Sequence, residues 1–147
     1  MIEFKSLDES FFAASQIDAQ DIARAAAEGF EAVVSFRPDG EDSDQPDADL
    51  VASWAADQGL GFHCLPLVPG QMTQDHILGL KNIIDNVEGQ VLGFCRSGMR
   101  AAIMWALVRS AEAKMDEENI LISSQKAGYD LTNVAALVSD VRGSLQS

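Results

Sequence analysis

One stretch of the sequence joins a strand, a short polar loop and a helix around a cysteine. Residues 91–94 form an apolar run of strand length, and from Met99 the chain continues as an apolar, alanine-rich segment with helical spacing. This order places successive backbone N–H groups around one point at the positive end of the helix dipole. Cys95 stands at the end of the predicted strand, where its sulfur faces those amides. We therefore expect a nucleophilic thiolate at the floor of an anion-binding loop.

The residues that follow Cys95 argue against a purely structural cysteine. A lone cysteine is usually a small buried hydrophobe, but the next five residues include two arginines, a serine and a glycine, which make a poor core sequence. Two guanidiniums beside the sulfur favour its thiolate form. Cys95 and Arg100 are the predicted catalytic pair, and the predicted anion-binding residues are Arg96, Ser97, Gly98, Met99 and Arg100.

The charge balance limits the kinds of partner. The chain has 147 residues, which suits a single domain covering residues 1–147, and a net charge of −13. Nucleic acids and anionic membranes require the opposite sign, so neither is an expected partner. Against this acidic background, the two arginines beside Cys95 indicate a small anionic ligand.

The spacing of the cysteines and the pattern of the N-terminal residues predict the cellular compartment of the protein and whether it holds a metal or cofactor. No apolar run is long enough to span a membrane, and the start of the chain lacks the charged-then-apolar pattern of a signal peptide. The two cysteines form no CxxC motif and no His/Cys cluster, so we expect free thiols, no metal and no cofactor. These features predict a cytoplasmic protein.

Hydrophobic periodicity and capping residues divide the chain into alternating strands and helices. An edge strand or hairpin is expected within residues 4–14, and strands are expected at 30–36, 61–67 and 91–94. Helices are expected at 18–29, from Asp47 or Asp49 to 59, at 73–86, from 99 onward, at 115–128 and at 131–145. This alternation predicts an α/β fold with a mostly parallel central sheet and helices on both faces.

The topology also predicts which loops surround the cysteine. In open parallel sheets the ligand lies beyond the carboxyl ends of the strands, and Cys95 falls at such an end. The loops after residues 36 and 66 reach the same edge. Arg37 either adds positive charge to the site or pairs with a neighbouring carboxylate. The candidate rim residues in these loops are Arg37, Asp39, Gly70 and Gln71.

The motif at residues 95–100 resembles the loop of cysteine-dependent phosphatases and rhodaneses. More closely, the chain resembles the bacterial DUF442 family, which is described as beta-lactamase hydrolase-like proteins. The similarity extends to residues 29–30, 33–41, 65–67 and 127–131. The resemblance implies a dual-specificity-phosphatase-like fold with the cysteine loop between a strand and a helix, and it implies either phosphatase or sulfurtransferase activity.

The loop length favours sulfur transfer. Cysteine phosphatases place five residues between the cysteine and the arginine, whereas four separate Cys95 from Arg100, as in the rhodanese loop that carries a persulfide. Ala101 stands where phosphatases have Ser or Thr, and residues 67–71 contain no acid. Asp75, one turn further on, is the remaining candidate rim residue. Loss of the proton donor would slow phosphoester cleavage about 10²–10⁴-fold.

Three functions are consistent with this loop. The preferred one is a cysteine-dependent, rhodanese-like sulfurtransferase that forms a persulfide on Cys95. The alternative is a tyrosine- or dual-specificity-phosphatase-like hydrolase that uses Cys95 and Arg100 through a phosphocysteine. A non-catalytic anion-binding module is the second alternative. The expected partners are a small anionic, thiol or persulfide substrate and a persulfide-handling protein.

Overall fold

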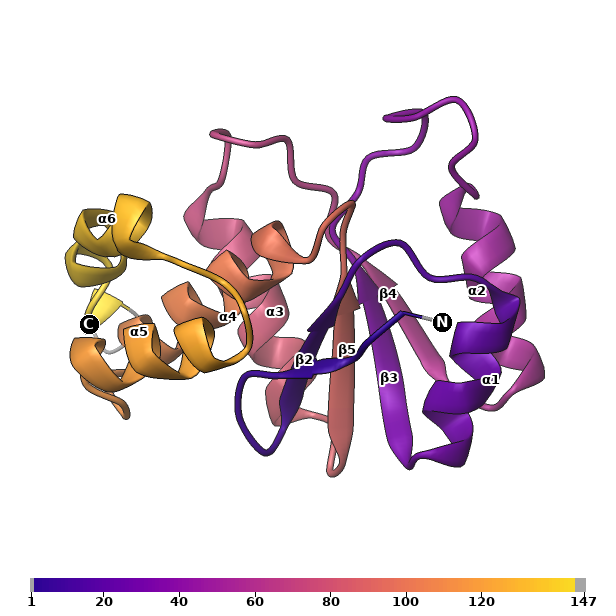
Figure 1. The fold of residues 1–147 in the computed structure, drawn as a ribbon, viewed down its shortest axis with the longest axis horizontal. Coiled ribbons are helices and arrows are strands. Elements are labelled where there is room, and N and C mark those ends of the chain that lie inside the picture. The colour runs from indigo at the N-terminus through magenta and orange to yellow at the C-terminus, as the bar shows by residue number, and fades with distance from the viewer. Residues whose placement is uncertain (1, 145–147) are drawn as a thin grey trace.

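A five-stranded sheet forms the centre of the molecule. The computed structural model describes residues 2–144. The strands are β1 (Lys5–Ser6), β2 (Phe11–Ala14), β3 (Phe30–Ser35), β4 (Gly61–Cys64) and β5 (Gln90–Phe94), in the spatial order β1-β2-β5-β3-β4 (Figure 1). Only the β1–β2 pair is antiparallel; the other three pairings are parallel. The predicted mostly parallel sheet and N-terminal hairpin are confirmed.

Helices cover both faces of this sheet. The helices α1 (Ala19–Ala27) and α2 (Ala48–Asp57) lie on one face. The opposite face carries α3 (Gln74–Asp85), α4 (Met99–Glu112), α5 (Glu117–Lys126), a 3₁₀ turn (Thr132–Val134) and α6 (Ala135–Asp140) (Figure 1). Two separate apolar clusters fill the two interfaces. Among residues 2–144, no helix combines the length and apolar character needed to cross a membrane.

Capping aspartates fix the starts of three helices. Asp18 accepts a hydrogen bond from the backbone N–H of Asp21 at 2.9 Å, and Asp47 accepts one from Leu50 at 2.8 Å. Asp116 caps α5 in the same way. Each carboxylate satisfies an N–H that has no partner within its own helix. The bond from Leu50 therefore makes Asp47, one of the two predicted start positions, the capping residue of α2.

Two predicted elements are shorter than expected. The strand predicted at 61–67 ends at Cys64, because Pro66 has no N–H to donate, although Leu65 and Leu67 still donate to β3 and Phe36 carbonyls. The helix predicted at 131–145 is a 3₁₀ turn followed by α6. Val134, with φ −118° and ψ 13°, interrupts the helical backbone between them. Leu145 lies outside the described residues.

The alternation of side chains along β5 determines where the cysteine points. Val91 packs in the cluster beneath α3 and α4, whereas Leu92 and Phe94 pack beneath α1 and α2. Cys95 continues the alternation and belongs to the α3–α4 side. The sulfur therefore lies on the same side of the sheet as the helix that follows it.

Helix α4 is anchored to the N-terminal hairpin by a partly buried polar cluster. Most of its residues are buried, and Trp105 is completely so. The Asp8 carboxylate accepts hydrogen bonds from Trp105 Nε1 at 2.7 Å and from Arg109 Nε at 2.9 Å, and also from the backbone of the hairpin turn. These donors hold the pKa of Asp8 below its usual range against the opposing effect of burial.

We expect Asp8→Ala to lower the free energy of unfolding by about 2–4 kcal/mol. The substitution leaves the buried N–H of Trp105 and the guanidinium of Arg109 without their shared acceptor. Urea unfolding followed by circular dichroism measures the loss. The neighbouring exposed Glu9→Ala removes the same charge and serves as the control. Equal stability of the two variants would show that Asp8 does not anchor α4.

Candidate active site

The cysteine sulfur lies beneath the start of α4. Cys95 follows β5 directly and is buried, with 1% of its surface exposed. The backbone N–H of Gly98, the residue that precedes α4, donates a hydrogen bond to Cys95 Sγ at 3.0 Å. An N–H at a helix N-terminus stabilises negative charge on the sulfur. The predicted juxtaposition of Cys95 and this helix end is therefore present.

Gly98 is required at this position for two reasons. Its φ of +95° lies in the left-handed region, where residues with a side chain are strained. In addition, a Cβ atom at this position would lie 2.1 Å from the Tyr129 hydroxyl oxygen. The ring of Tyr129 thus packs directly against the cysteine loop from the segment after α5. A side chain at position 98 would displace either the loop or this tyrosine.

The Tyr129 hydroxyl is itself unusual. It is buried, and among the described residues it has no hydrogen-bond partner. Burial, together with the negative charge of Cys95 and of Glu3, raises the pKa of Tyr129 to about 12. The hydroxyl therefore stays protonated at neutral pH and is not a general base.

Arg100 is oriented by a carboxylate from a distant loop. Its Nη1 and Nη2 donate to the two oxygens of Glu41 at 2.8 and 2.7 Å, and Nη1 also donates to the Leu67 carbonyl at 2.9 Å. The hydrogen bonds that Arg100 donates to Glu41 raise the pKa of Arg100, and electrostatic interaction with Cys95 contributes.

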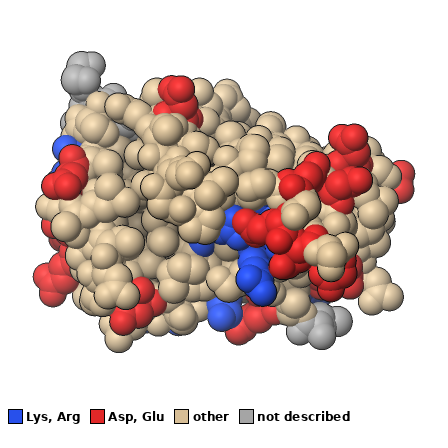
Figure 2. Space-filling view, turned by 90° about the horizontal axis from the view of Figure 1, so that it is seen from above, with Lys and Arg blue, Asp and Glu red and all other residues tan. Residues whose placement is uncertain are grey.

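Glu41 also binds a second guanidinium. Arg37 is buried, and its Nε donates to Glu41 at 2.9 Å while its Nη2 donates to Asp42 at 2.7 Å. Arg96 is largely exposed, and its Nε lies 3.4 Å from Asp42 Oδ2. Figure 2 shows a small cluster of basic side chains near the middle of one face, bordered by acidic side chains. Of the two roles considered for Arg37, pairing with neighbouring acids is the one observed.

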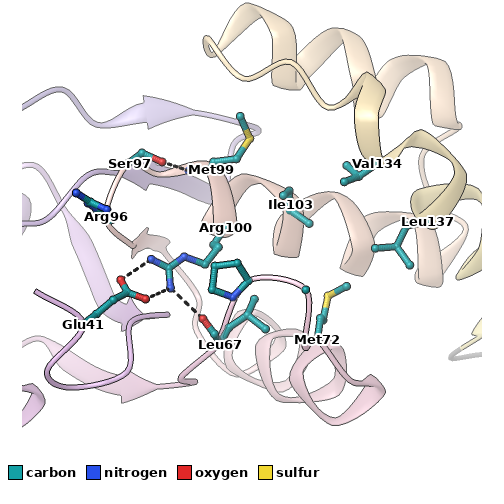
Figure 3. A pocket seen from close by; sticks show the side chains of 12 residues that line it. Glu41, Leu67, Met72, Arg96, Ser97, Met99, Arg100, Ile103, Val134 and Leu137 are labelled. Carbon is teal, nitrogen blue, oxygen red and sulfur yellow. Dashed lines mark hydrogen bonds and ion pairs between the residues drawn. The ribbon is translucent and has the colours of Figure 1, made fainter.

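A cavity of about 660 Å³ opens beside the loop. Its polar end contains Glu41, Arg96, Ser97 and Arg100, and apolar side chains form the rest of the wall (Figure 3). Cys95 does not belong to this wall, because its sulfur lies beneath the loop. The apolar lining consists of Leu67, Pro69, Met72, Met99, Ile103, Val134 and Leu137, with Gly70 between them.

The structure separates the candidate rim residues. Gly70 lines the cavity, whereas Asp39 accepts a hydrogen bond from the backbone N–H of Ala48 at the start of α2. Asp75 borders a different depression, together with Cys64 and His76. Gln71 is exposed and is not among the described residues that line the cavity. Of the predicted rim residues in these loops, Gly70 lines this cavity, whereas Asp39, Gln71 and Asp75 are not among its described lining residues.

The sequence did not identify two residues of the site. Glu41 is one of several acids in a polar loop, and nothing in its local sequence indicates Arg100 as its partner. Tyr129 belongs to the segment 127–131, whose resemblance to the DUF442 family was the only available signal. Both residues reach the loop through contacts between distant parts of the chain.

Comparison with known proteins places this arrangement in the phosphatase-like class of folds. A candidate phosphatase from Neisseria meningitidis Z2491 superposes with a TM-score of 0.85 at 28% identity, covering 95% of this chain and 98% of that one. A DUF442 candidate phosphatase from Shewanella putrefaciens CN-32 gives a TM-score of 0.76 at 14% identity, covering 97% and 89%. The predicted fold class is confirmed.

The chain belongs to the family described as beta-lactamase hydrolase-like protein, phosphatase-like domain, whose sequence pattern matches residues 3–112. The beta-lactamase hydrolase-like protein of Xylella fastidiosa (strain Temecula1) is 27% identical over 125 residues, which cover 85% of this chain. The chain spans only 29% of the length of that relative. The family resemblance stated from the sequence is confirmed.

We expect Glu41→Gln to reduce stability in a pH-dependent manner. Hydrogen bonds from Arg100 and Arg37 hold the pKa of Glu41 below its usual range, so the unfolded state binds more protons than the folded state as the pH falls. The stabilisation is therefore complete above the usual glutamate pKa and is lost as the pH falls through the lowered one. At pH 7 the variant should lose about 0.5–1 kcal/mol, because solvent screens the ion pairs of the exposed Glu41, and the difference should shrink on acidification.

Thermal unfolding between pH 3 and pH 7 measures this effect. Asp44→Asn, a change of an exposed acid in the same loop, is the matched control. A Glu41→Gln deficit that stayed constant across this range would contradict the ion-pair interpretation.

Proposed function

We propose that the chain is a cysteine-dependent phosphatase, with Cys95 as its nucleophile and Arg100 as its oxyanion ligand. The observation that carries the proposal is the 3.0 Å hydrogen bond from Gly98 N–H to Cys95 Sγ at the N-terminus of α4. The phosphatase-like family and fold support this hydrolase over the sulfurtransferase that the loop length favours. The reaction needs a free thiolate, so a reducing compartment such as the cytoplasm suits it.

Each step of the proposed reaction uses a group near the loop. The Cys95 thiolate attacks phosphorus, an S–P bond forms, and the ester P–O bond breaks with its electron pair leaving on oxygen. The guanidinium of Arg100 and the N-terminal amides of α4 stabilise the charge on the phosphoryl oxygens. Water then attacks phosphorus, the S–P bond breaks, and phosphate and the thiolate are released.

The cavity holds no acid suited to protonating the leaving oxygen. Glu41 is the one carboxylate among the described residues that line it, and its lowered pKa keeps it ionised. A general acid typically contributes about 10²–10⁴-fold to such a reaction. The proposed substrates are therefore esters whose leaving oxygen departs without a proton, such as aryl phosphates.

We expect release of phosphate from p-nitrophenyl phosphate, and we expect Cys95→Ser to abolish it. Cys64→Ser, which removes the exposed second thiol, should retain it. Across a series from nitrophenyl to simple alkyl phosphates, kcat/KM should fall about 10²–10⁴-fold as the leaving-group pKa rises, because no acid assists departure. Activity in Cys95→Ser, or a rate independent of the leaving group, would overturn the mechanism.

Sulfur transfer is the second candidate, and the four-residue spacing between Cys95 and Arg100 favours it. The Cys95 thiolate would attack the outer sulfur of thiosulfate, forming a Cys95 persulfide and expelling sulfite with the bonding electrons. Cyanide, or a thiolate of a persulfide-handling partner, would then take that sulfur and regenerate Cys95. Neither step requires a general acid.

Intact-mass spectrometry after brief incubation with thiosulfate separates the candidates. Under the phosphatase proposal the mass of the protein stays unchanged. A gain of one sulfur atom that is absent in Cys95→Ser and removed by cyanide would instead establish sulfur transfer. Phosphate binding without either reaction would support the non-catalytic anion-binding module instead.

A further inference from the structure

The cavity beside the cysteine loop has two chemically different ends. The loop end carries Arg96, Ser97 and Arg100, with Glu41 holding Arg100 in place. Away from the loop, the wall follows α4, on which Met99 and Ile103 lie one turn apart on the same face. Val134 and Leu137 of the C-terminal segment close this wall opposite Met72 (Figure 3). A charged head and an apolar body are therefore the complementary features of a ligand.

The size and lining of the cavity favour a small molecule. Its volume of about 660 Å³ lies within the range of sites for small organic ligands. The wall beyond the arginines consists of apolar side chains, which offer no partners for the N–H and C=O groups of a bound peptide. The net charge of −13 also repels anionic membranes and acidic peptides, whereas a single phosphate head meets the local arginines.

From these features we infer that the cavity binds a small amphiphilic phosphate ester, in which an aryl phosphate head carries an apolar tail. This inference rests on the proposed phosphatase function and specifies its substrate class. The phosphate lies at Arg100 beside the loop, and the tail extends along α4 past Ile103 toward Leu137. The flexible side chains of Met72 and Met99 adapt the wall to tails of different shape.

A homologous series of 4-alkylphenyl phosphates tests the inference. The alkyl group lengthens the tail while the acidity of the phenol leaving group stays nearly constant, so binding is separated from chemistry. Titration calorimetry with the Cys95→Ser protein, below the critical micelle concentration, measures affinity without turnover. We expect the dissociation constant to fall about fourfold with each added methylene until the tail outgrows the wall, as expected for burial of one methylene.

Two matched substitutions locate the tail. Leu137 lines the cavity and is 37% exposed, whereas Ile122 on α5 is 40% exposed and is not among the residues that line it. Leu137→Asp should weaken binding of the longest phosphate at least tenfold and bring its affinity close to that of the shortest. Ile122→Asp should leave the chain-length series unchanged. Circular dichroism checks that both variants fold.

The outcomes separate this inference from the proposed function. Phosphate release by the wild type with an affinity that does not depend on tail length would overturn the inference and retain the phosphatase. Tight, tail-dependent binding without phosphate release would retain the inference and overturn the phosphatase. Binding to anionic vesicles with no affinity for the monomeric phosphates would replace the small amphiphile with a membrane surface and also overturn the inference.

Discussion

The position of one carboxylate decides the geometry of the site. Glu41 lies between Arg37 and Arg100, and it joins the loop after β3 to the first turn of α4, 59 residues away in sequence. The same guanidinium of Arg100 contacts the carbonyl of Leu67, so the loop after β4 belongs to this junction as well. Around it, three arginines pair with two carboxylates, so this group of side chains carries one net positive charge. In a protein with a net charge of −13, this local excess is what distinguishes the site.

The cysteine loop is held from beneath as well as from its rim. Helix α4 is tied to the N-terminal hairpin through Asp8, which fixes the direction of its axis. Tyr129 fills the space next to Gly98, which fixes the turn that precedes the helix. The hydrogen bond from the Gly98 N–H to the Cys95 sulfur lies at the start of the helix, beside these two contacts. A hydrogen-bond donor that is already held in place stabilises charge on a neighbouring atom at a smaller entropic cost than a donor in a mobile loop.

The parts that could be predicted from sequence are those that depend on local patterns. The run 91–94, the polar loop and the apolar segment after Met99 define β5, the loop and α4, and short-range capping defines the start of α1 at Asp18. The partner of Arg100 could not be predicted, because residues 39–49 contain six acids and only tertiary contacts select Glu41. The surroundings of Asp75 could not be predicted for a similar reason, because periodicity locates its helix but the direction of its side chain depends on how α3 packs.

The family match ends at residue 112, whereas Tyr129, Val134 and Leu137 lie beyond it. The cysteine loop and the wall formed by Val134 and Leu137 are therefore encoded in different parts of the chain. Change in residues 113–144 can reshape what enters the cavity while the sulfur, its helix and its arginine keep their arrangement. Tyr129 limits such change, because its hydroxyl and the adjoining ring atoms fill the space beside Gly98. In this architecture the residues that line the far end of the cavity can therefore diverge faster than those around the sulfur. The contact between Tyr129 and Gly98 joins the two parts.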